Sequence, residues 1–523
     1  MTPRAATELA RQATPPRVGR PGVFVTLAAL TLTAATFIPL GYIVSVLFDT
    51  GLREAADLVF RPRVGELLGN TAALVVCTVP VCVVLGIGLA WLVERTDVPG
   101  RSWWGPVLVA PLAVPAFVNS YGWVSAFPSM HGLSAAVVVC TLSYFPLVYL
   151  PVAATLRRLD PAIEESARAL GSGPAEVFRR IVVPQLRLAI LGGGLLIGLH
   201  LLAEYGAFVM LRYDTFTTAI FEQYQSSFAG PAGSMLAGVL VLCCLALLGG
   251  ESLLRGNARY ARLGSGAPRA IRPITLGWWR IPLFGVLVAV VVATLGVPLW
   301  TIGRWLWLGG SAVWDMTTIG TALGQTIGLA AAAALVTTLC AFPVAWIAVR
   351  STSRFARMIE GANYITSSLP GIVIALALVT VTIRWTPPLY QTATLLVLAY
   401  VLMFLPRALV SVRAGLAQVP AGLEEVSRSL GESASATFFR VTLRMTAPAA
   451  ASAAALVFVA VSTELTATLL LAPNGTRTLA MQFWGLSGEL DYAAAAPYAL
   501  IMIVAAVPVT YLLFTQSRKA AGV

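Results

Sequence analysis

Two carboxylates inside long apolar segments are the residues with the most evident chemistry. Glu204 and Glu464 lie 260 positions apart, each within an apolar run of about 20 residues. A carboxylate inside a bilayer is costly, which makes it a candidate functional residue. His200 precedes Glu204 by one helical turn and so shares its face, and Tyr205 follows directly.

Two interpretations of these carboxylates stay open. In the first, they line a transport pathway; in the second, each is hydrogen-bonded between helices and only organises a gate. The sequence has no G-x-x-x-x-G-K-[S/T] phosphate loop, and its single lysine is Lys519. Its histidines and six cysteines lack the spacing of a zinc site. We therefore expect no enzyme, no cofactor and no firm metal site in this chain.

A polar segment occurs twice, once in each half of the chain. Residues 161–180 read PAIEESARALGSGPAEVFRR, and residues 420–440 read PAGLEEVSRSLGESASATFFR. A shift of 260 positions superposes two glutamates, a glycine and a phenylalanine: Glu164, Glu165, Gly171 and Phe178 on Glu424, Glu425, Gly431 and Phe438. Two charged segments of one spacing, set between apolar spans, suggest a surface that partners bind twice.

Each copy is predicted to form two short helices joined by a glycine turn. Asp160 can cap the first helix, and the proline after it suits the first helical position. The glutamates fall in the early turns, where the helix dipole favours carboxylates. Gly171 and Gly431 can end the helix in the left-handed conformation. The second helix begins at Pro174, or near Ser433, and carries the phenylalanine.

The rest of the chain has the composition of a membrane protein. Its 523 residues are 58% hydrophobic and 11% charged, with a mean hydropathy of +0.82, whereas soluble domains are about one quarter charged. Helices satisfy their own backbone in lipid. We predict an all-α polytopic membrane protein with about 12 transmembrane helices, at roughly 23–48, 68–93, 105–126, 133–156, 188–211, 234–254, 281–303, 323–348, 361–383, 389–412, 449–472 and 494–515.

Basic residues orient these spans. With the N-terminus inside, the inner loops and tails hold 28 of the arginines and lysines, and the outer loops hold 7. This asymmetry follows the positive-inside rule, so both repeated loops and both termini are expected in the cytoplasm. The net charge of +12 is therefore explained by topology in a lipid bilayer, and no nucleic-acid partner is expected.

The two halves match beyond the loops. At an offset of 255 positions, Gly69-Asn70-Thr71 aligns with Gly324-Gln325-Thr326. Four single residues align at the same offset: Trp91, Arg95, Pro115 and Pro151 with Trp346, Arg350, Pro370 and Pro406. Six spans per half is an even number, which predicts two parallel six-helix repeats. The predicted organisation is a tail at 1–20, a first repeat at 21–256 (core about 66–254), a linker at 257–280 and a second repeat at 281–523 (core about 321–515).

The repeated segment resembles the cytoplasmic coupling loop of binding-protein-dependent ABC importer permeases. In that family a glutamate and two small residues open the motif. Glu165-Ser166-Ala167 takes this place in the first copy, and Glu425-Val426-Ser427 in the second, which departs at both small positions. Three further stretches are similar to ferric-iron permeases with fused halves: 94–101, Leu369-Pro370-Gly371 and Glu464–Leu471.

The resemblance implies a permease in a bacterial plasma (inner) membrane that itself hydrolyses nothing. Two ATPase subunits, which carry ATP and Mg, would each receive one coupling loop, and an external binding protein would deliver the cargo. Ferric iron is the expected cargo; thiamine, phosphonate, polyamine or sugar phosphate are alternatives. A secondary transporter is the alternative of a different class, since Asp97-x-x-Gly100-Arg101 is faintly similar to its loop signature, although the second half lacks it.

Overall fold

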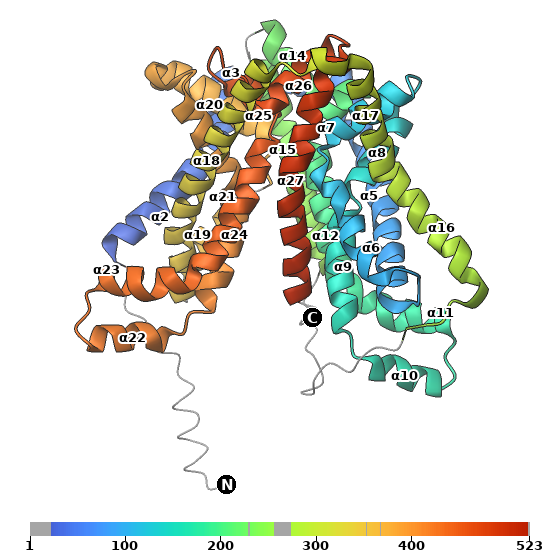
Figure 1. The fold of residues 1–523 in the computed structure, drawn as a ribbon. Helices are drawn as coiled ribbons and strands as arrows, with labels where there is room; N and C mark the ends of the chain where they lie inside the picture. Colours follow the sequence, from blue (N-terminus) through green and yellow to red (C-terminus); the bar gives the residue numbers. More distant parts are fainter. Residues whose placement is uncertain (1–21, 228–230, 256–272, 352, 367, 521–523) are drawn as a thin grey trace. The chain divides into compact units, whose positions relative to one another are not determined.

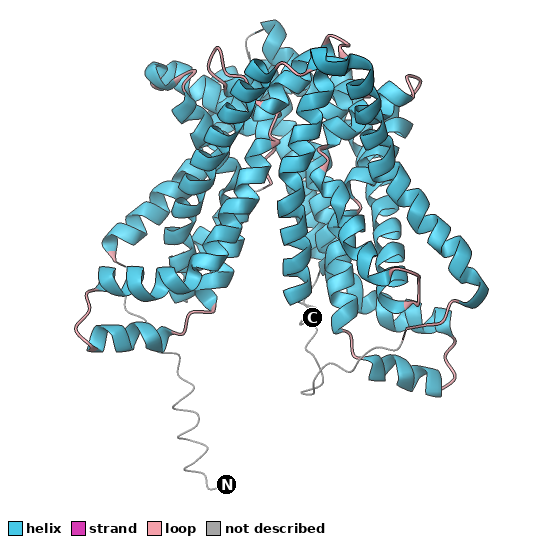
Figure 2. Ribbon diagram, in the orientation of Figure 1, coloured by secondary structure: helices cyan, strands magenta, loops and turns pink. Residues whose placement is uncertain are grey.

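The structure, a computed structural model, describes residues 22–227, 231–255, 273–351, 353–366 and 368–520. These residues are helical apart from their connections and one isolated bridge between Thr96 and Ile274 (Figures 1 and 2). They form two compact units. Unit 1 takes in the described residues up to Ile38, of 329–366 and of 397–461; unit 2 takes in those of 39–328, 368–396 and 462–520. The predicted tail and most of the predicted linker lie outside the described residues, and the predicted repeat boundaries stay predictions.

The helices of the described residues are, in chain order, α2 (Val23–Thr36), α3 (Ile38–Thr50), α4 (Leu52–Val59), α5 (Pro62–Arg95), α6 (Arg101–Val109), η1 (Ala110–Ala113), α7 (Ala116–Ala126), α8 (Gly132–Tyr144), α9 (Pro146–Arg158), α10 (Pro161–Ala169), α11 (Pro174–Val177), η2 (Phe178–Val182), α12 (Val183–Ala203), α13 (Gly206–Met210), α14 (Phe216–Ser227), α15 (Pro231–Arg255), η3 (Gly277–Trp279), α16 (Arg280–Val291), η4 (Val292–Gly296), α17 (Val297–Gly309), η5 (Gly310–Val313), α18 (Met316–Arg350), α19 (Arg354–Thr366), α20 (Gly371–Trp385), η6 (Pro387–Leu389), α21 (Ala393–Ala417), α22 (Ala421–Ser429), α23 (Ala434–Thr437), η7 (Phe438–Thr442), α24 (Leu443–Ser462), α25 (Thr466–Leu471), α26 (Leu479–Gly488) and α27 (Tyr492–Ala520).

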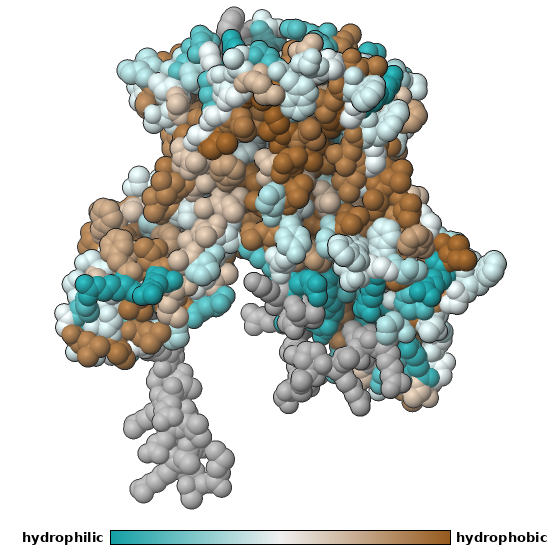
Figure 3. All heavy atoms as spheres, in the orientation of Figure 1, coloured by the Kyte–Doolittle hydropathy of each residue, from teal (hydrophilic) through white to brown (hydrophobic). Residues whose placement is uncertain are grey.

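Helices that are long and apolar enough to cross a membrane occur all along the described part of the chain. Nine helices there are long and apolar enough to cross a bilayer, and the number is eleven if each of two bent helix pairs counts as one span. The shorter apolar helix α20 lies at a further predicted span. Apolar side chains cover the sides of the long helices, and polar ones gather over their ends (Figure 3). The prediction of a polytopic all-α membrane protein is confirmed.

Several spans predicted as continuous helices are broken. Residues 105–126 bend by 90° between the stretches Arg101–Ala113 and Ala116–Ala126, and residues 361–383 divide between α19 and α20. Pro115 precedes α7 with φ −56° and ψ 144°, and the equivalent Pro370 precedes α20 with φ −60° and ψ 144°. Proline lacks an amide proton and disfavours helix in the residue before it. The two aligned prolines therefore begin new helices at the same point of each half.

Glycine allows three helices of unit 2 to approach closely. A Cβ atom on Gly193 of α12 would lie 2.8 Å from Val148 Cγ2 and 2.9 Å from the Leu147 carbonyl oxygen, both on α9. A Cβ atom on Gly86 of α5 would lie 3.0 Å from the Val148 side chain. Small residues at such contacts are typical of packing between membrane helices, where backbone approach replaces the hydrophobic effect.

In unit 1, a buried polar contact joins α2 to α19. The amide group of Asn363 donates to Thr33 Oγ1 at 3.0 Å and to the Ile359 carbonyl at 2.8 Å. Both side chains are buried. A Cβ atom on Gly415 of α21 would clash with Ala449 Cβ of α24, so these helices also meet at a glycine.

The close approach at Gly193 can be tested by adding one methyl group. Gly193→Ala is expected to destabilise the protein by about 1–3 kcal/mol relative to Gly192→Ala, because only the first Cβ meets α9. Both substitutions gain the same helix propensity, which makes Gly192→Ala a matched control. Thermal unfolding of the detergent-solubilised protein measures the difference, and equal melting temperatures would contradict the packing described.

Candidate functional site

The first repeated loop forms the two short helices expected from its sequence. Asp160 Oδ1 accepts the backbone amide of Ala162 at 3.0 Å and so caps α10. Gly171 ends the helix with φ +92°, its amide donating to the Arg168 carbonyl while that of Ser172 donates to the Ala167 carbonyl. This pair of bonds satisfies the last carbonyls of the helix. Helix α11 then leads through η2 into α12.

The second loop repeats this geometry in unit 1. Gly431 has φ +87°, its amide donates to the Arg428 carbonyl, and the amide of Glu432 donates to the Ser427 carbonyl. Ser433 caps α23 by accepting the amide of Ala436 at 3.2 Å. The loops thus share a helix, a left-handed glycine and a second short helix, at α10–α11 and α22–α23 in Figure 1.

One glutamate of each pair anchors its loop to a long helix. Glu164 Oε1 lies 2.9 Å from Arg95 Nη2 at the end of α5, and these side chains are 12% and 5% exposed. Glu424 Oε1 accepts from Arg350 Nη2 at 2.6 Å at the end of α18, where both side chains are 8% exposed. Thr442 Oγ1 also donates to Glu424, at 3.0 Å. Removing one partner of a buried ion pair costs about 3–5 kcal/mol, because the other charge is left uncompensated.

The opposite face of each first helix is open. Glu165 and Glu425 are exposed, as are Ser166 and Val426, whereas Ala167 and Ser427 are half-buried. Two leucines beside the glycine stops stand out: Leu170 is 87% exposed and Leu430 is 79% exposed. Each loop therefore presents an exposed carboxylate and an exposed leucine. A surface with both charged and apolar groups suits binding in a groove of another protein.

The phenylalanines hold the second helix of each loop against the same long helix as the glutamate. The Phe178 ring packs edge-on to Trp91 of α5 with centroids 6.1 Å apart. The Phe438 ring packs on Trp346 of α18 at 5.7 Å and on Phe342 at 6.1 Å. Each phenylalanine opens a π-helical turn, η2 or η7, which is a rare geometry frequent at functional sites.

The two glutamates predicted to lie in the membrane occur where the fifth predicted span of each half breaks. Glu204 follows α12 in an extended conformation, and its Oε1 accepts the amide of Ala207 at 3.0 Å, in the first turn of α13. Glu464 follows α24, and its Oε1 accepts the amide of Ala467 at 2.9 Å, in the first turn of α25. Each carboxylate thus satisfies a backbone donor that the break exposes, which lipid could not satisfy.

In the first half, the Glu204 carboxylate has a second hydrogen-bond partner. Tyr144 of α8 donates its hydroxyl to Glu204 Oε2 at 2.7 Å, and its ring lies 5.5 Å from that of His200. His200 Nδ1 lies 2.7 Å from the Leu196 carbonyl oxygen. The structure therefore brings Tyr144, His200 and Glu204 together. Sequence reasoning missed Tyr144, since its only signal is a hydroxyl in an apolar span 60 residues away.

The two breaks meet in unit 2 at a closely packed aromatic region. A Cβ atom on Gly206 would lie 2.9 Å from Phe117 Cβ, 3.1 Å from Leu465 Cδ2 and 3.3 Å from Trp484. Tyr205 is buried between Phe221, 4.4 Å away by ring centroids, and Trp484, 5.5 Å away. Tyr205 and Leu465 are the residues that directly follow the two glutamates. The structure thus seals the region between the breaks with apolar groups.

The aligned segments 69–71 and 324–326 form hydrogen bonds with the loops that follow these breaks. Asn70 Nδ2 donates to the Asp214 carbonyl at 3.2 Å, and Gln325 Oε1 accepts the amide of Arg477 at 2.6 Å. Thr326 Oγ1 likewise accepts the amide of Leu479 at 2.9 Å. Tyr213 donates to the Asn70 carbonyl at 2.8 Å, and burial raises the pKa of this phenol, so it remains a donor.

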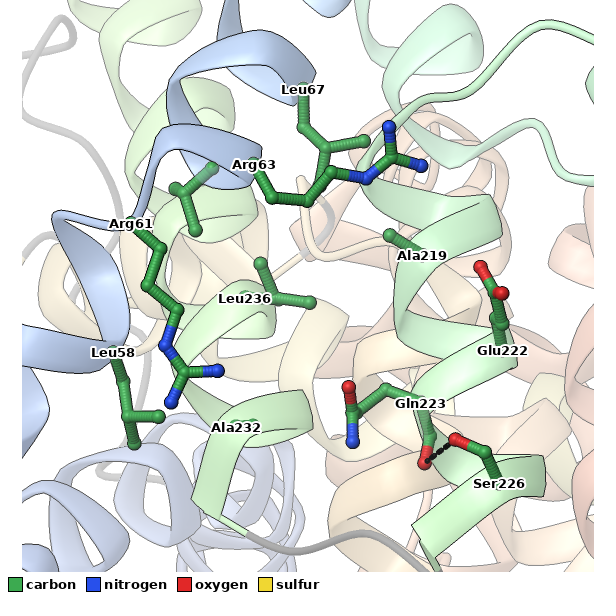
Figure 4. A pocket seen from close by; sticks show the side chains of 11 residues that line it. Leu58, Arg61, Arg63, Leu67, Ala219, Glu222, Gln223, Ser226, Ala232 and Leu236 are labelled. Atoms are coloured by element: carbon green, nitrogen blue, oxygen red, sulfur yellow. Dashed lines mark hydrogen bonds between the residues drawn. The ribbon is translucent and has the colours of Figure 1, made fainter.

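Two cavities border this end of unit 2. One, of about 390 Å³, is lined by Tyr205, Arg212, Asp214 and Glu222 among others. The second, of about 220 Å³, is lined by Arg61, Arg63, Gln223 and Ser226 among others (Figure 4). Arg63 is paired with Asp214 at 2.6 Å. Among the residues that the structure describes, no group of three or more His, Cys, Asp or Glu could hold a metal ion.

Arg95 and Arg350 are the loop-anchoring residues that sequence reasoning did not assign. Both had appeared in the alignment of the halves, at the same offset as Trp91 and Trp346. Charged residues that recur at the end of an apolar span were a usable signal. The signal was incomplete because it did not say which glutamate of each pair would turn inward.

The chain shares its pattern with known proteins. The family model described as binding-protein-dependent transport system inner membrane component matches residues 82–250 and again residues 341–519. The chain is 36% identical over 488 residues to the Fe(3+)-transport system permease protein FbpB 2 of Haemophilus influenzae, covering 93% of this chain and 96% of that protein.

More distant relatives match in part. The ferric transport system permease protein FbpB of Actinobacillus pleuropneumoniae is 24% identical over 432 residues, covering 76% of this chain and 62% of that protein. The sulfate transport system permease protein CysW of Synechocystis is 25% identical over 249 residues, 43% of this chain and 89% of that protein. Both repeated loops fall inside the segments that the family model matches. The chain therefore belongs to the family of binding-protein-dependent transport system inner membrane components, the permeases of ABC importers, and it carries the family's unit twice.

Proposed function

We propose that this chain is the permease of an ATP-driven importer that carries ferric iron into a bacterial cell. The observation that carries the proposal is the pair of loops with the same glycine stop, the same buried Glu–Arg anchor and the same exposed leucine. One ATPase subunit binds each loop and holds ATP and Mg. The permease hydrolyses nothing, and a binding protein outside the cell delivers the cargo.

The anchors explain how movement of an ATPase could reach the membrane helices. In the first loop, Glu164 contacts Arg95 and Phe178 contacts Trp91, and both partners belong to the last turns of α5. In the second loop, Glu424 and Phe438 contact Arg350 and Trp346 of α18 in the same way. A loop held at two points moves its helix as a rigid body. Alternating access then follows from the closing and opening of the ATPase pair.

The distribution of basic residues supports the orientation. The 28 inner and 7 outer basic residues assign both loops and both termini to the cytoplasm. The breaks at Glu204 and Glu464 and the adjoining cavities then belong to the outer half of the protein. In this arrangement, the packed region around Tyr205 and Trp484 is an outer gate that opens for cargo.

The cargo is inferred from a relative and from the charge of the pathway. The relative that is aligned over 93% of this chain is named for Fe(3+) transport. Glu204, Glu464 and the Tyr205 phenol are hard oxygen groups, which suit ferric iron, whereas carboxylates would repel sulfate or a phosphonate. The sulfate permeases match only part of this chain, which speaks for a shared architecture rather than a shared cargo.

The exposed leucines give a test of ATPase docking. Leu170→Ser and Leu430→Ser together are expected to remove the ATPase subunits from the purified permease, because each change takes a bare apolar side chain from the docking surface. Each buried leucine contributes about 1.5–3 kcal/mol, so each ATPase subunit should bind its loop roughly 10- to 100-fold more weakly. Co-purification in detergent measures the loss.

The control is Leu52→Ser in α4, a leucine that is 78% exposed and predicted to lie outside the cell. This variant should retain the ATPase subunits. Equal retention by the control and by the Leu170/Leu430 double variant would contradict docking at the loops.

Iron uptake tests the proposed function directly. Deleting the gene should abolish uptake of radioactive ferric iron by this route and leave thiamine and phosphonate uptake unchanged, and the wild-type gene should restore it. Preserved iron uptake in the deletion strain would overturn the cargo.

The same strain separates the two roles of the glutamates. Glu204→Gln and Glu464→Gln keep an oxygen that accepts the amides of Ala207 and Ala467 but remove both charges. If the charges line the pathway, the double Gln variant should lower uptake about tenfold, equivalent to about 1.4 kcal/mol, with basal ATPase activity intact. Normal uptake by the Gln variants, with loss in Glu→Ala variants, would leave only the capping role.

A further inference from the structure

The turn that follows α5, Thr96–Trp104, contains the Asp97-x-x-Gly100-Arg101 motif, which the coupling loops leave unexplained. The turn is built by its own polar groups. Arg101 Nη2 donates to the Glu94 carbonyl at 2.6 Å, and Trp104 Nε1 donates to the Pro99 carbonyl at 2.7 Å. Gly100 has φ +71°, which L side chains rarely adopt. The motif thus encodes a fixed turn rather than a flexible connection.

A distant segment pairs with this turn. Residues 273–276 re-enter the described structure before α16, and Ile274 forms the isolated parallel bridge with Thr96. The Ile274 amide donates to the Arg95 carbonyl at 2.8 Å, and the Asp97 amide donates to the Ile274 carbonyl at 3.2 Å. Asp97 Oδ1 accepts the amide of Leu276 at 2.9 Å. Three hydrogen bonds therefore hold the segment that leads into the second half.

Apolar packing extends the contact. Leu276 and Leu283 pack against the core cluster that contains the buried Val98. The Trp104 ring lies 5.6 Å from Phe284 of α16, in an edge-on arrangement. The turn thus fixes both the incoming segment and the helix that follows it.

This contact lies on the anchor of the first coupling loop. Arg95 uses its carbonyl to bind Ile274 and its guanidinium to bind Glu164. Arg95 is 4% exposed and Thr96 is fully buried, with its hydroxyl donating to the Leu92 carbonyl. The last residue of α5 is therefore held from two sides, by the coupling loop and by residues 273–276.

We propose that Asp97 is a positioning residue for the first coupling loop, acting through Arg95 with residues 273–276 as its partner. The inference rests on the proposed function of the loop. By fixing the backbone of Arg95, the contact holds the guanidinium where Glu164 meets it. Movement of the loop is thereby passed to the start of the second half as well as to α5. Loss of the contact leaves ATP hydrolysis less tightly linked to transport.

The test uses the full chain with its ATPase subunits in proteoliposomes, supplied with iron-loaded binding protein. Asp97→Ala removes the acceptor, and Leu276→Pro removes the donor at a residue whose φ of −80° proline can adopt. Asp97→Asn retains an accepting oxygen. The readout is iron transported per ATP hydrolysed, with thermal unfolding recorded for each variant.

Asp97→Ala and Leu276→Pro should each lower this ratio roughly two- to tenfold, the factor expected for one hydrogen bond. Asp97→Asn should stay near wild type. The double variant should be no worse than Leu276→Pro alone, because Asp97 has no Leu276 amide left to accept once the donor is gone. Asp315→Ala, which removes a carboxylate that accepts the amides of Thr317 and Thr318, is the matched control and should leave the ratio unchanged.

An unchanged ratio in both single variants, or effects that multiply in the double variant, would overturn the inference. If Asp97→Ala does not fold, the contrast between Asp97→Asn and Leu276→Pro decides the same question. Failure of the proposed function would look different, since the wild-type chain itself would then retain no ATPase subunits and transport no iron.

Discussion

The ion pair between a loop glutamate and the arginine that ends a long helix is the contact on which the rest of the arrangement depends. Glu164 and Arg95 form it in unit 2, and Glu424 and Arg350 form it in unit 1. Both pairs are nearly buried, so a single missing partner would be costly. The inward glutamate frees its neighbour, Glu165 or Glu425, and a leucine to face outward. One interaction thus orients an entire loop, once in each unit.

The bilayer explains the second recurring device. A broken helix exposes backbone donors that lipid cannot satisfy, and Glu204 and Glu464 satisfy one donor each at equivalent breaks. The same residues supply negative charge beside a closely packed aromatic region. The structure shows the capping contact of each carboxylate, whereas a place in the transport pathway belongs to the proposed function. The halves also differ here, since Tyr144 adds a hydrogen bond to Glu204.

Local features of the sequence predicted more than distant ones. The glycine stops, the cap at Asp160 and the restart near Ser433 follow from neighbouring residues, and the structure confirms them. The duplicated spans and loops were equally readable, because repetition needs no tertiary information. Contacts between residues far apart in the chain could not be predicted in this way. Arg350 lies 74 residues before Glu424, so which glutamate turns inward depends on packing. The breaks after Pro115 and Pro370 had a local signal, but apolar character alone predicted continuous spans.

A double-mutant cycle on Arg350 and Glu424 tests the central claim most directly, with ATP-driven iron uptake in proteoliposomes as the measurement. The account predicts that Arg350→Met and Glu424→Leu each reduce uptake strongly, because each leaves a buried charge unpaired, and that the double variant recovers part of the loss. Asp315→Ala, which lies outside both loops, serves as the comparison and should leave uptake unchanged. Independent losses at Arg350 and Glu424, with no recovery in the double variant, would contradict the anchor.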